Sequence, residues 1–199
     1  MTFHKKNQAG FSLIEMLVAV SILLLVIVGP MTITARTAKS STFATEQVEA
    51  FFLAQEGLEI VQKVRDDLLL EYFAGTADPW TRFTNTSNAG ILWHCYNPNG
   101  CGLEWARSVP LAGLIAPVRS CVIVSNCLLH FDATPALRSQ YTYIAPFIPN
   151  PTKYTRIIRL IQNGDNVFVR STVTWRTGSL VADQRVEVNT YLYRLYAPS

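Results

Sequence analysis

The chain has 199 residues, of which 49% are hydrophobic and 16% charged, and its formal net charge at pH 7 is +3. Two of its cations, Lys5 and Lys6, precede the first apolar run, and without them the charge falls to +1, which is a weak argument for a nucleic-acid partner. No phosphate-binding glycine loop, nucleophile motif or paired-carboxylate arrangement occurs, so we expect no enzyme, cofactor or metal site.

A long apolar segment begins close to the N-terminus. Met16–Val28 is apolar except for Ser21, and with its neighbours it forms about 25 residues, 11–35, which is enough to cross a bilayer. Gly10 precedes this segment, whereas an ordinary secretory signal carries its small residue after the apolar region. Cleavage at Gly10 would therefore remove only a basic leader, residues 1–10, and leave a retained helix.

Glu15 lies inside the apolar segment. A carboxylate costs at least about 2.5 kcal/mol at a bilayer centre and less near the interface, so Glu15 needs a partner. Gly29-Pro30 interrupts the segment further on. Proline removes a backbone donor and clashes with the preceding turn, which predicts a kink or local melting at Gly29 and Pro30.

The hexapeptide Gly10-Phe11-Ser12-Leu13-Ile14-Glu15 resembles the class III signal of type IV pilins and type II secretion pseudopilins. The resemblance implies that a membrane prepilin peptidase cleaves between Gly10 and Phe11 and N-methylates Phe11. It also implies that Glu15 pairs with the N-terminal amine of a neighbouring subunit. The alternative is an uncleaved signal anchor, in which Glu15 lies near the interface and is hydrated.

Past Thr45 the hydrophobicity becomes periodic, which predicts an amphipathic helix over 36–72. Apolar or small residues recur at three- and four-residue steps, while the charged residues from Glu46 to Asp66 fall mostly off that stripe. The stripe consists of Ala50, Leu53, Ala54, Gly57, Ile60, Val61, Val64 and Leu68. A helix from Phe11 to Tyr72 would be about 90 Å long. The stretch 53–59 is similar to that of minor pilins and minor pseudopilins.

Residues 73–199 form the expected extracytoplasmic head. Thr155–Gln162, Val167–Trp175 and Val186–Leu192 alternate apolar and polar residues between turn sequences, which predicts an antiparallel meander at about 155–195. Residues 146–151 are expected to be loop, and Val122–Val124 a brief strand. The pattern defines an α+β fold, and the pilin resemblance implies that the sheet covers the helix stripe.

Cys95, Cys101, Cys121 and Cys127 are candidates for two disulfides, because the count is even and the head is expected outside the cytoplasm. Cys95 and Cys101 flank a turn, whereas a local Cys121–Cys127 bond needs a chain reversal near Ser125-Asn126; pairing across the two segments is the competing arrangement. His94 and His130 adjoin the cysteines, but the spacing does not match a zinc motif.

These observations favour a structural subunit over an enzyme. We expect a pilin-like protein in the cytoplasmic membrane, with its N-terminus inside, that assembles with other pilins or pseudopilins on an inner-membrane platform. The irregular head favours a minor component. The alternative is a membrane-tethered tip adhesin or a DNA- or substrate-binding module. A DNA-binding surface would require the arginines of the meander to share one face of the sheet, although a solvated strand face explains them more simply. These arginines are Arg156, Arg159, Arg170, Arg176 and Arg185.

Overall fold

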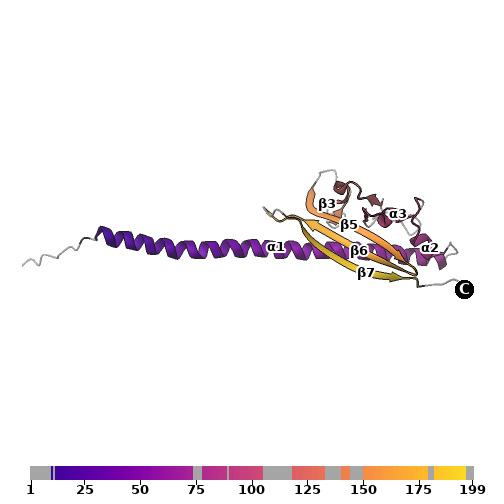
Figure 1. The fold of residues 1–199 in the computed structure, drawn as a ribbon, viewed down its shortest axis with the longest axis horizontal. Helices are drawn as coiled ribbons and strands as arrows, with labels where there is room; N and C mark the ends of the chain where they lie inside the picture. Colours follow the sequence, from indigo (N-terminus) through magenta and orange to yellow (C-terminus); the bar gives the residue numbers. More distant parts are fainter. Residues whose placement is uncertain are drawn as a thin grey trace, which may run out of the picture. The chain divides into compact units, whose positions relative to one another are not determined.

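The fold is α+β, with a long N-terminal helix followed by an antiparallel sheet, as the sequence predicts (Figure 1). The chain divides into two compact units, residues 1–45 and 46–199, and helix α1 (Leu13–Phe73) contributes to both. Lys5, Lys6 and Phe11 lie outside the described part of the chain. The computed structural model describes residues 10, 12–73, 78–88, 90–104, 118–132, 140–143, 150–178 and 182–195.

The second half of α1 buries one face against the rest of the second unit. The eight residues of the predicted stripe are all buried, which confirms the periodicity, and Leu58 is buried with them. Glu46 was expected to lie off the stripe but is also buried, because its carboxylate is hydrogen-bonded to the sheet. The helix ends at Phe73, one residue beyond the predicted end.

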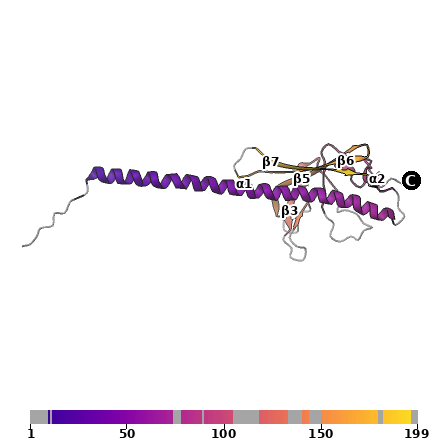
Figure 2. The same cartoon turned by 90° about the horizontal axis from the view of Figure 1, so that it is seen from below.

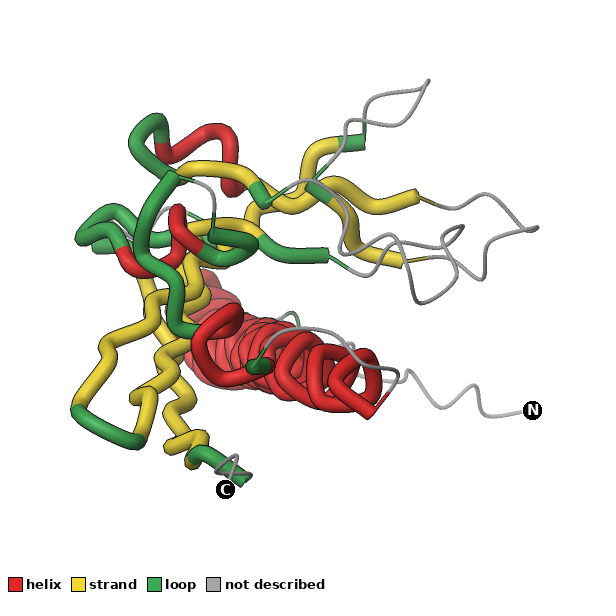
Figure 3. Tube along the Cα trace, turned by 90° about the vertical axis from the view of Figure 1, so that its right-hand side faces the viewer, coloured by secondary structure: helices red, strands yellow, loops and turns green. Residues whose placement is uncertain are grey.

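Three long strands form the meander that covers this face. They are β5 (Pro151–Asn163), β6 (Asn166–Trp175) and β7 (Gln184–Tyr193), paired antiparallel in chain order. Seen along the helix, the strands lie as a layer against one side of α1 (Figure 3). In the view of Figure 2, β7 and β3 appear on opposite sides of the helix axis, so α1 crosses the sheet near its middle.

Short strands extend the other edge of β5. Strand β1 (Cys101–Gly102) pairs with it at Ile158, and β3 (Leu128–Asp132) pairs with its N-terminal end. Each short strand carries a further one, β2 (Arg119–Ser120) beside β1 and β4 (Gln140–Thr142) beside β3. Pro151 was expected in a loop but begins β5, a position where the missing N–H is tolerated.

The remaining described elements are short helices: α2 (Pro79–Phe83), α3 (Trp93–Tyr96) and the 3₁₀ helix η1 (Val124–Cys127). Helices α3 and η1 contact β5, whereas α2 is paired with the end of α1 through Arg82 and Glu71. Asp78 caps α2, because its carboxylate accepts from the amides of Trp80 and Thr81. The hydroxyl of Thr81, which donates to this carboxylate, and then the two amides hold the pKa of the Asp78 carboxyl below its ordinary value, against the effect of burial. The cap thus satisfies backbone amides at the start of the first short helix after α1.

The structure pairs the cysteines locally, as Cys95–Cys101 and Cys121–Cys127, with Cα–Cα distances of 4.6 and 5.6 Å. The reversal needed for the second bond is provided by η1. Val122–Val124 was expected as a strand and is instead a turn running into η1, with all three side chains exposed. An extended run of this length would hold the two cysteines too far apart to bond.

Helix and sheet approach each other closely at Gly57. A Cβ atom added there would lie 2.5 Å from Oγ of Ser171, 3.2 Å from Cδ1 of Ile158 and 3.3 Å from Cδ of Arg156. Ser171 and Ile158 are opposite each other in the β5–β6 pairing and are fully buried. A larger residue at position 57 would therefore displace side chains at the centre of the sheet, which favours glycine here.

Replacing Gly57 with alanine should destabilise the head. Overpacking a tight core costs about 1–3 kcal/mol, which exceeds the helix propensity gained by alanine. Urea unfolding of the full chain in detergent measures the loss, and Gly29→Ala is the matched control, since nothing lies within 4 Å of a Cβ at that position. A Gly57→Ala head as stable as the wild type would contradict this packing.

Candidate functional site

Helix α1 begins at Leu13, shortly after the predicted cleavage point between Gly10 and Phe11. The backbone carbonyl of Ser12 accepts from the amides of Glu15 and Met16 at 3.0 and 3.2 Å, which sets the first turn of α1. Glu15 lies in that turn, where the unpaired amides of a helix N-terminus favour a negative charge. Its carboxylate has no ion-pair partner within the described ranges and is exposed to solvent.

The apolar side chains of this unit are uncovered on every side of the helix. Between Leu13 and Ile33 the large apolar residues are 45–83% exposed. Burying such side chains is worth roughly 1.5–3 kcal/mol each, so the segment requires an apolar environment that the described chain does not supply. Within the described residues, α1 is the one helix long and apolar enough to cross a membrane.

Polar groups within the apolar segment are satisfied by the helix itself. The hydroxyls of Ser21, Thr32 and Thr34 donate to backbone carbonyls three or four residues earlier, at 2.8–2.9 Å. This pattern suits a helix in lipid, where an unpaired hydroxyl is costly. Helix α1 continues through Gly29 and Pro30, and a kink at that point stays a prediction.

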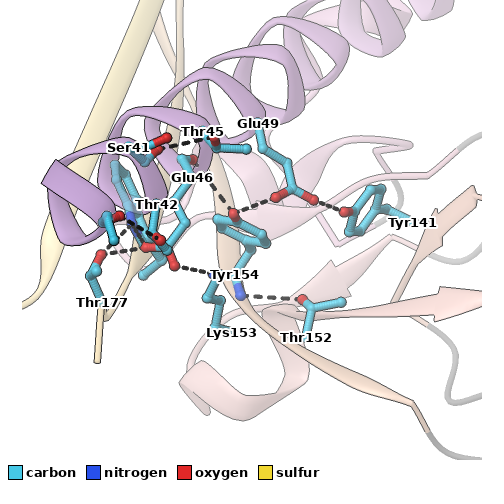
Figure 4. Close-up of polar contacts among 12 residues, drawn as sticks. Ser41, Thr42, Thr45, Glu46, Glu49, Tyr141, Thr152, Lys153, Tyr154 and Thr177 are labelled. Atoms are coloured by element: carbon cyan, nitrogen blue, oxygen red, sulfur yellow. Dashed lines mark hydrogen bonds and ion pairs between the residues drawn. The ribbon is translucent and has the colours of Figure 1, made fainter. Parts of the chain in front are cut away.

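A cluster of hydrogen bonds attaches α1 to the sheet in the second unit (Figure 4). The Glu46 carboxylate accepts from Nζ of Lys153, from Oγ1 of Thr177 and from Nε1 of Trp175, the last at 3.2 Å. Burial would raise the pKa of Glu46, but these hydrogen bonds and the Lys153 charge hold it below its ordinary value of 4.5.

One turn further on, Glu49 extends the cluster. Its carboxylate accepts from the hydroxyls of Tyr154, at 2.6 Å, and Tyr141. Burial and the neighbouring carboxylate raise the pKa of Tyr154, so its hydroxyl stays protonated and acts as a donor. Glu46 and Glu49 together link α1 to strands β4, β5 and the end of β6.

Arg156 occupies the centre of the helix–sheet interface and is fully buried. Its guanidinium donates to the Leu53 carbonyl at 3.0 Å, the Glu56 carboxylate at 2.7 Å and the Leu103 carbonyl at 2.9 Å, and its Nε donates to the Tyr143 hydroxyl at 2.8 Å. A buried charge is tolerated when it is paired and hydrogen-bonded in this way. Arg156 is thus part of the packing and does not belong to a solvent-facing arginine surface.

The other arginines of the meander are also engaged. Arg170 and Arg185 both contact Glu187, Arg176 pairs with Asp183 at 2.8 Å, and Arg159 donates to the Pro98 carbonyl at 2.7 Å. The described residues contain no group of three or more His, Cys, Asp or Glu that could hold a metal ion. Each of these arginines is thus engaged locally, and the exposed pair of Arg176 and Asp183 contributes little to stability.

The comparisons with known proteins support the reading of the N-terminal segment. Residues 5–29 match the family described as the prokaryotic N-terminal methylation motif. The matched segment contains Gly10, Phe11 and Glu15 and ends at Gly29. It marks a pilin-like prepilin signal, of the kind processed by prepilin peptidase. No curated protein and no solved structure matches the chain.

Sequence reasoning missed the buried polar residues that attach helix to sheet. Arg156 lies in phase with Tyr154, Ile158 and Leu160, and this alternation is the signal that could have placed it on the buried face. Glu46 lies seven residues before Leu53, two turns away on the same side of the helix. Both residues occupy core positions, but their charge led to the prediction that they face solvent.

The hydrogen bonds of Glu46 predict a pH-dependent contribution to stability. Because its pKa is lowered by folding, the contribution is fully present above pH 4.5 and is lost as pH falls below 4.5 through the folded-state value. We expect Glu46→Gln to lower the free energy of unfolding by roughly 1–3 kcal/mol at neutral pH. The difference from the wild type should shrink on acidification.

Urea unfolding of the full chain in detergent, between pH 7 and pH 3, measures this difference. Glu59→Gln is the control, because Glu59 is an exposed carboxylate on the same helix and its loss should matter little at any pH. A Glu46→Gln deficit that stays constant over this range would show that the ionised carboxylate is not the group that stabilises the fold.

Proposed function

We propose that this protein is a pilin-like structural subunit that is processed by prepilin peptidase and assembled into a type IV pilus or a type II secretion-like pseudopilus. The observation that carries the proposal is the combination of a prepilin signal with a helix whose apolar surface is uncovered from Leu13 to Ile33. Such a helix can reside in lipid before assembly and pack against other helices afterwards. Within the class we propose a minor subunit, since the head between α1 and β5 consists of short elements.

Cleavage between Gly10 and Phe11 would create the group that Glu15 needs. The new α-amine, N-methylated on Phe11, is a cation, and Glu15 supplies an anion in the first turn of the helix. In an apolar environment each charge is costly alone, and the two compensate one another when they meet. The amine of one subunit would therefore pair with Glu15 of its neighbour and set their register.

The subunit would lie in the cytoplasmic membrane with its head outside the cytoplasm, and then move into the filament on the inner-membrane platform. Its partners are prepilin peptidase, other pilins or pseudopilins and membrane lipid. The head buries only the second half of α1, through the stripe from Ala50 to Leu68. The first half of α1 would then make the contacts between subunits. Folding of the head and assembly of the filament can therefore be tested separately.

Removing the charge of Glu15 should separate assembly from folding. In the native host we expect Glu15→Gln to be cleaved and methylated normally but to fall about tenfold or more in sheared filaments, which corresponds to at least roughly 1.4 kcal/mol. Quantitative immunoblotting of the sheared fraction against total protein is the measurement. Unchanged urea unfolding of the head confirms that the variant is folded.

Glu59→Gln is the matched control for charge removal and should be incorporated like the wild type. A Glu15→Gln subunit that reaches filaments at the wild-type level would contradict the proposed role of Glu15. A wild-type chain that is never found in filaments, despite an active peptidase and platform, would contradict the function itself and leave the binding module as the explanation.

A further inference from the structure

Strand β7 is the last strand on one side of the sheet. Among the described residues its one neighbour is β6, and the pairing runs from Asn166–Tyr193 to Trp175–Gln184 without a bulge. Strand β7 is ten residues long, and Figure 1 shows it as the outermost strand of the meander. In the described structure the other side of β7 is therefore unpaired, and its backbone groups are available to a further strand.

Proteins usually protect such an edge with charges, a proline, a bulge or a short strand. In β7 the two charged residues, Arg185 and Glu187, lie in the first part of the strand and pair with each other. Residues 188–193 contain neither a charge nor a proline, and we call this range the open edge. An unprotected edge is a surface on which an extended peptide can add as another strand, which is an established mode of peptide recognition.

The hydrogen bond just beyond β7 shows which backbone groups of the strand point outward. The amide of Arg194 donates to the Asp165 carbonyl at 3.2 Å, so Arg194 directs its backbone groups toward the neighbouring chain segment. In an antiparallel pair this direction alternates from one residue to the next. Asn189, Tyr191 and Tyr193 therefore direct their N–H and C=O groups away from β6. Donors and acceptors at every second residue form the pattern that an extended backbone matches.

The side chains of the open edge are uncharged on both faces of the sheet. On the solvent face Ile161, Phe168 and Tyr191 occupy paired positions of three neighbouring strands, and the rings of Phe168 and Tyr191 have centroids 5.0 Å apart. Tyr191 is 54% exposed and Tyr193 58%. On the other face Val188 packs against the core. A further strand would extend the solvent-face row, and aromatic and β-branched residues make favourable cross-strand pairs with tyrosine.

We propose that the open edge binds an extended, uncharged segment of another polypeptide, which adds to β7 as a further strand of the sheet. The backbone of this segment would pair with Asn189, Tyr191 and Tyr193, and its solvent-face side chains would be aromatic or β-branched. A charged segment fits poorly, because it would lay its charges beside the exposed tyrosine rings and Val188. Lipid has no matching row of backbone groups. The inference concerns the head alone and does not depend on incorporation into a filament.

Tyr191→Pro tests the proposal, and Tyr191→Ala is its matched control. Proline removes the outward N–H of residue 191 and is tolerated on an edge strand, whereas alanine loses the same ring but keeps the N–H. Selection from a display library of random peptides on the full chain in detergent supplies the probe. We expect uncharged peptides with aromatic or β-branched residues at alternate positions. Tyr191→Pro should bind them about tenfold more weakly than Tyr191→Ala does, because it offers one backbone donor fewer and a ring that obstructs the added strand.

Urea unfolding of both variants shows whether their heads are folded. If Tyr191→Pro does not fold, a selected peptide that is N-methylated at alternate amides takes its place in the test. Such a peptide keeps its side chains but cannot donate to the edge, so we expect its binding to the wild type to be lost. Unchanged binding of the methylated peptide in both methylation registers would overturn the proposal.

Amide hydrogen exchange of the wild-type chain locates the bound peptide. Protection of the amides of Asn189, Tyr191 and Tyr193 on peptide binding supports the proposal. The absence of any selected peptide, equal binding by Tyr191→Pro and Tyr191→Ala, or protection confined to other residues would overturn it. Protection of the same three amides that rises with protein concentration in the absence of peptide would identify a second copy as the occupant and would also overturn it.

Discussion

The uncovered apolar surface of the first half of α1 is the constraint on which the rest of the structure depends. Side chains from Leu13 to Ile33 cannot remain in water, and the described part of the chain provides nothing to bury them. Under the proposed function lipid covers them before assembly, and the hydroxyls that donate to backbone carbonyls of the same helix suit that environment. In the proposed filament the same apolar surface would meet other helices, and Glu15 is the one carboxylate between Leu13 and Ile33.

The second half of the same helix is, in contrast, buried on one face. It carries one buried stripe, closes on the sheet at Gly57 and is held by polar contacts from Glu46, Glu49 and Arg156. These contacts are directional, so they fix the register of helix and sheet where apolar packing alone tolerates sliding. A head held in this way can stay folded while the first half of the helix exchanges one environment for another. This separation is what a subunit that moves from a membrane into a filament requires.

Much of this arrangement follows from residue periodicity. The stripe from Ala50 to Leu68 and the three long strands were predicted by spacing alone, because burial of one face imposes periods of 3.6 and 2. Arg156 was not placed in the core, since its partners Tyr143 and Leu103 come from distant loops that only the folded chain brings together. Val122–Val124 failed as a strand because the bond between Cys121 and Cys127 forces a turn, and the pairing of cysteines is not encoded in local pattern. The predicted cleavage site depends on the order of basic leader, glycine and apolar run in the sequence. No helix or strand of the structure carries this information.

The most direct test of the account is the intact mass of the protein isolated from membranes, with and without a co-expressed prepilin peptidase. The account predicts loss of residues 1–10 and gain of one methyl group on Phe11 only when the peptidase is present. A chain that keeps the Gly10–Phe11 bond beside an active peptidase would contradict it. The protein would then be a signal-anchored extracytoplasmic domain, and the surface of its helix would have to be explained by lipid alone.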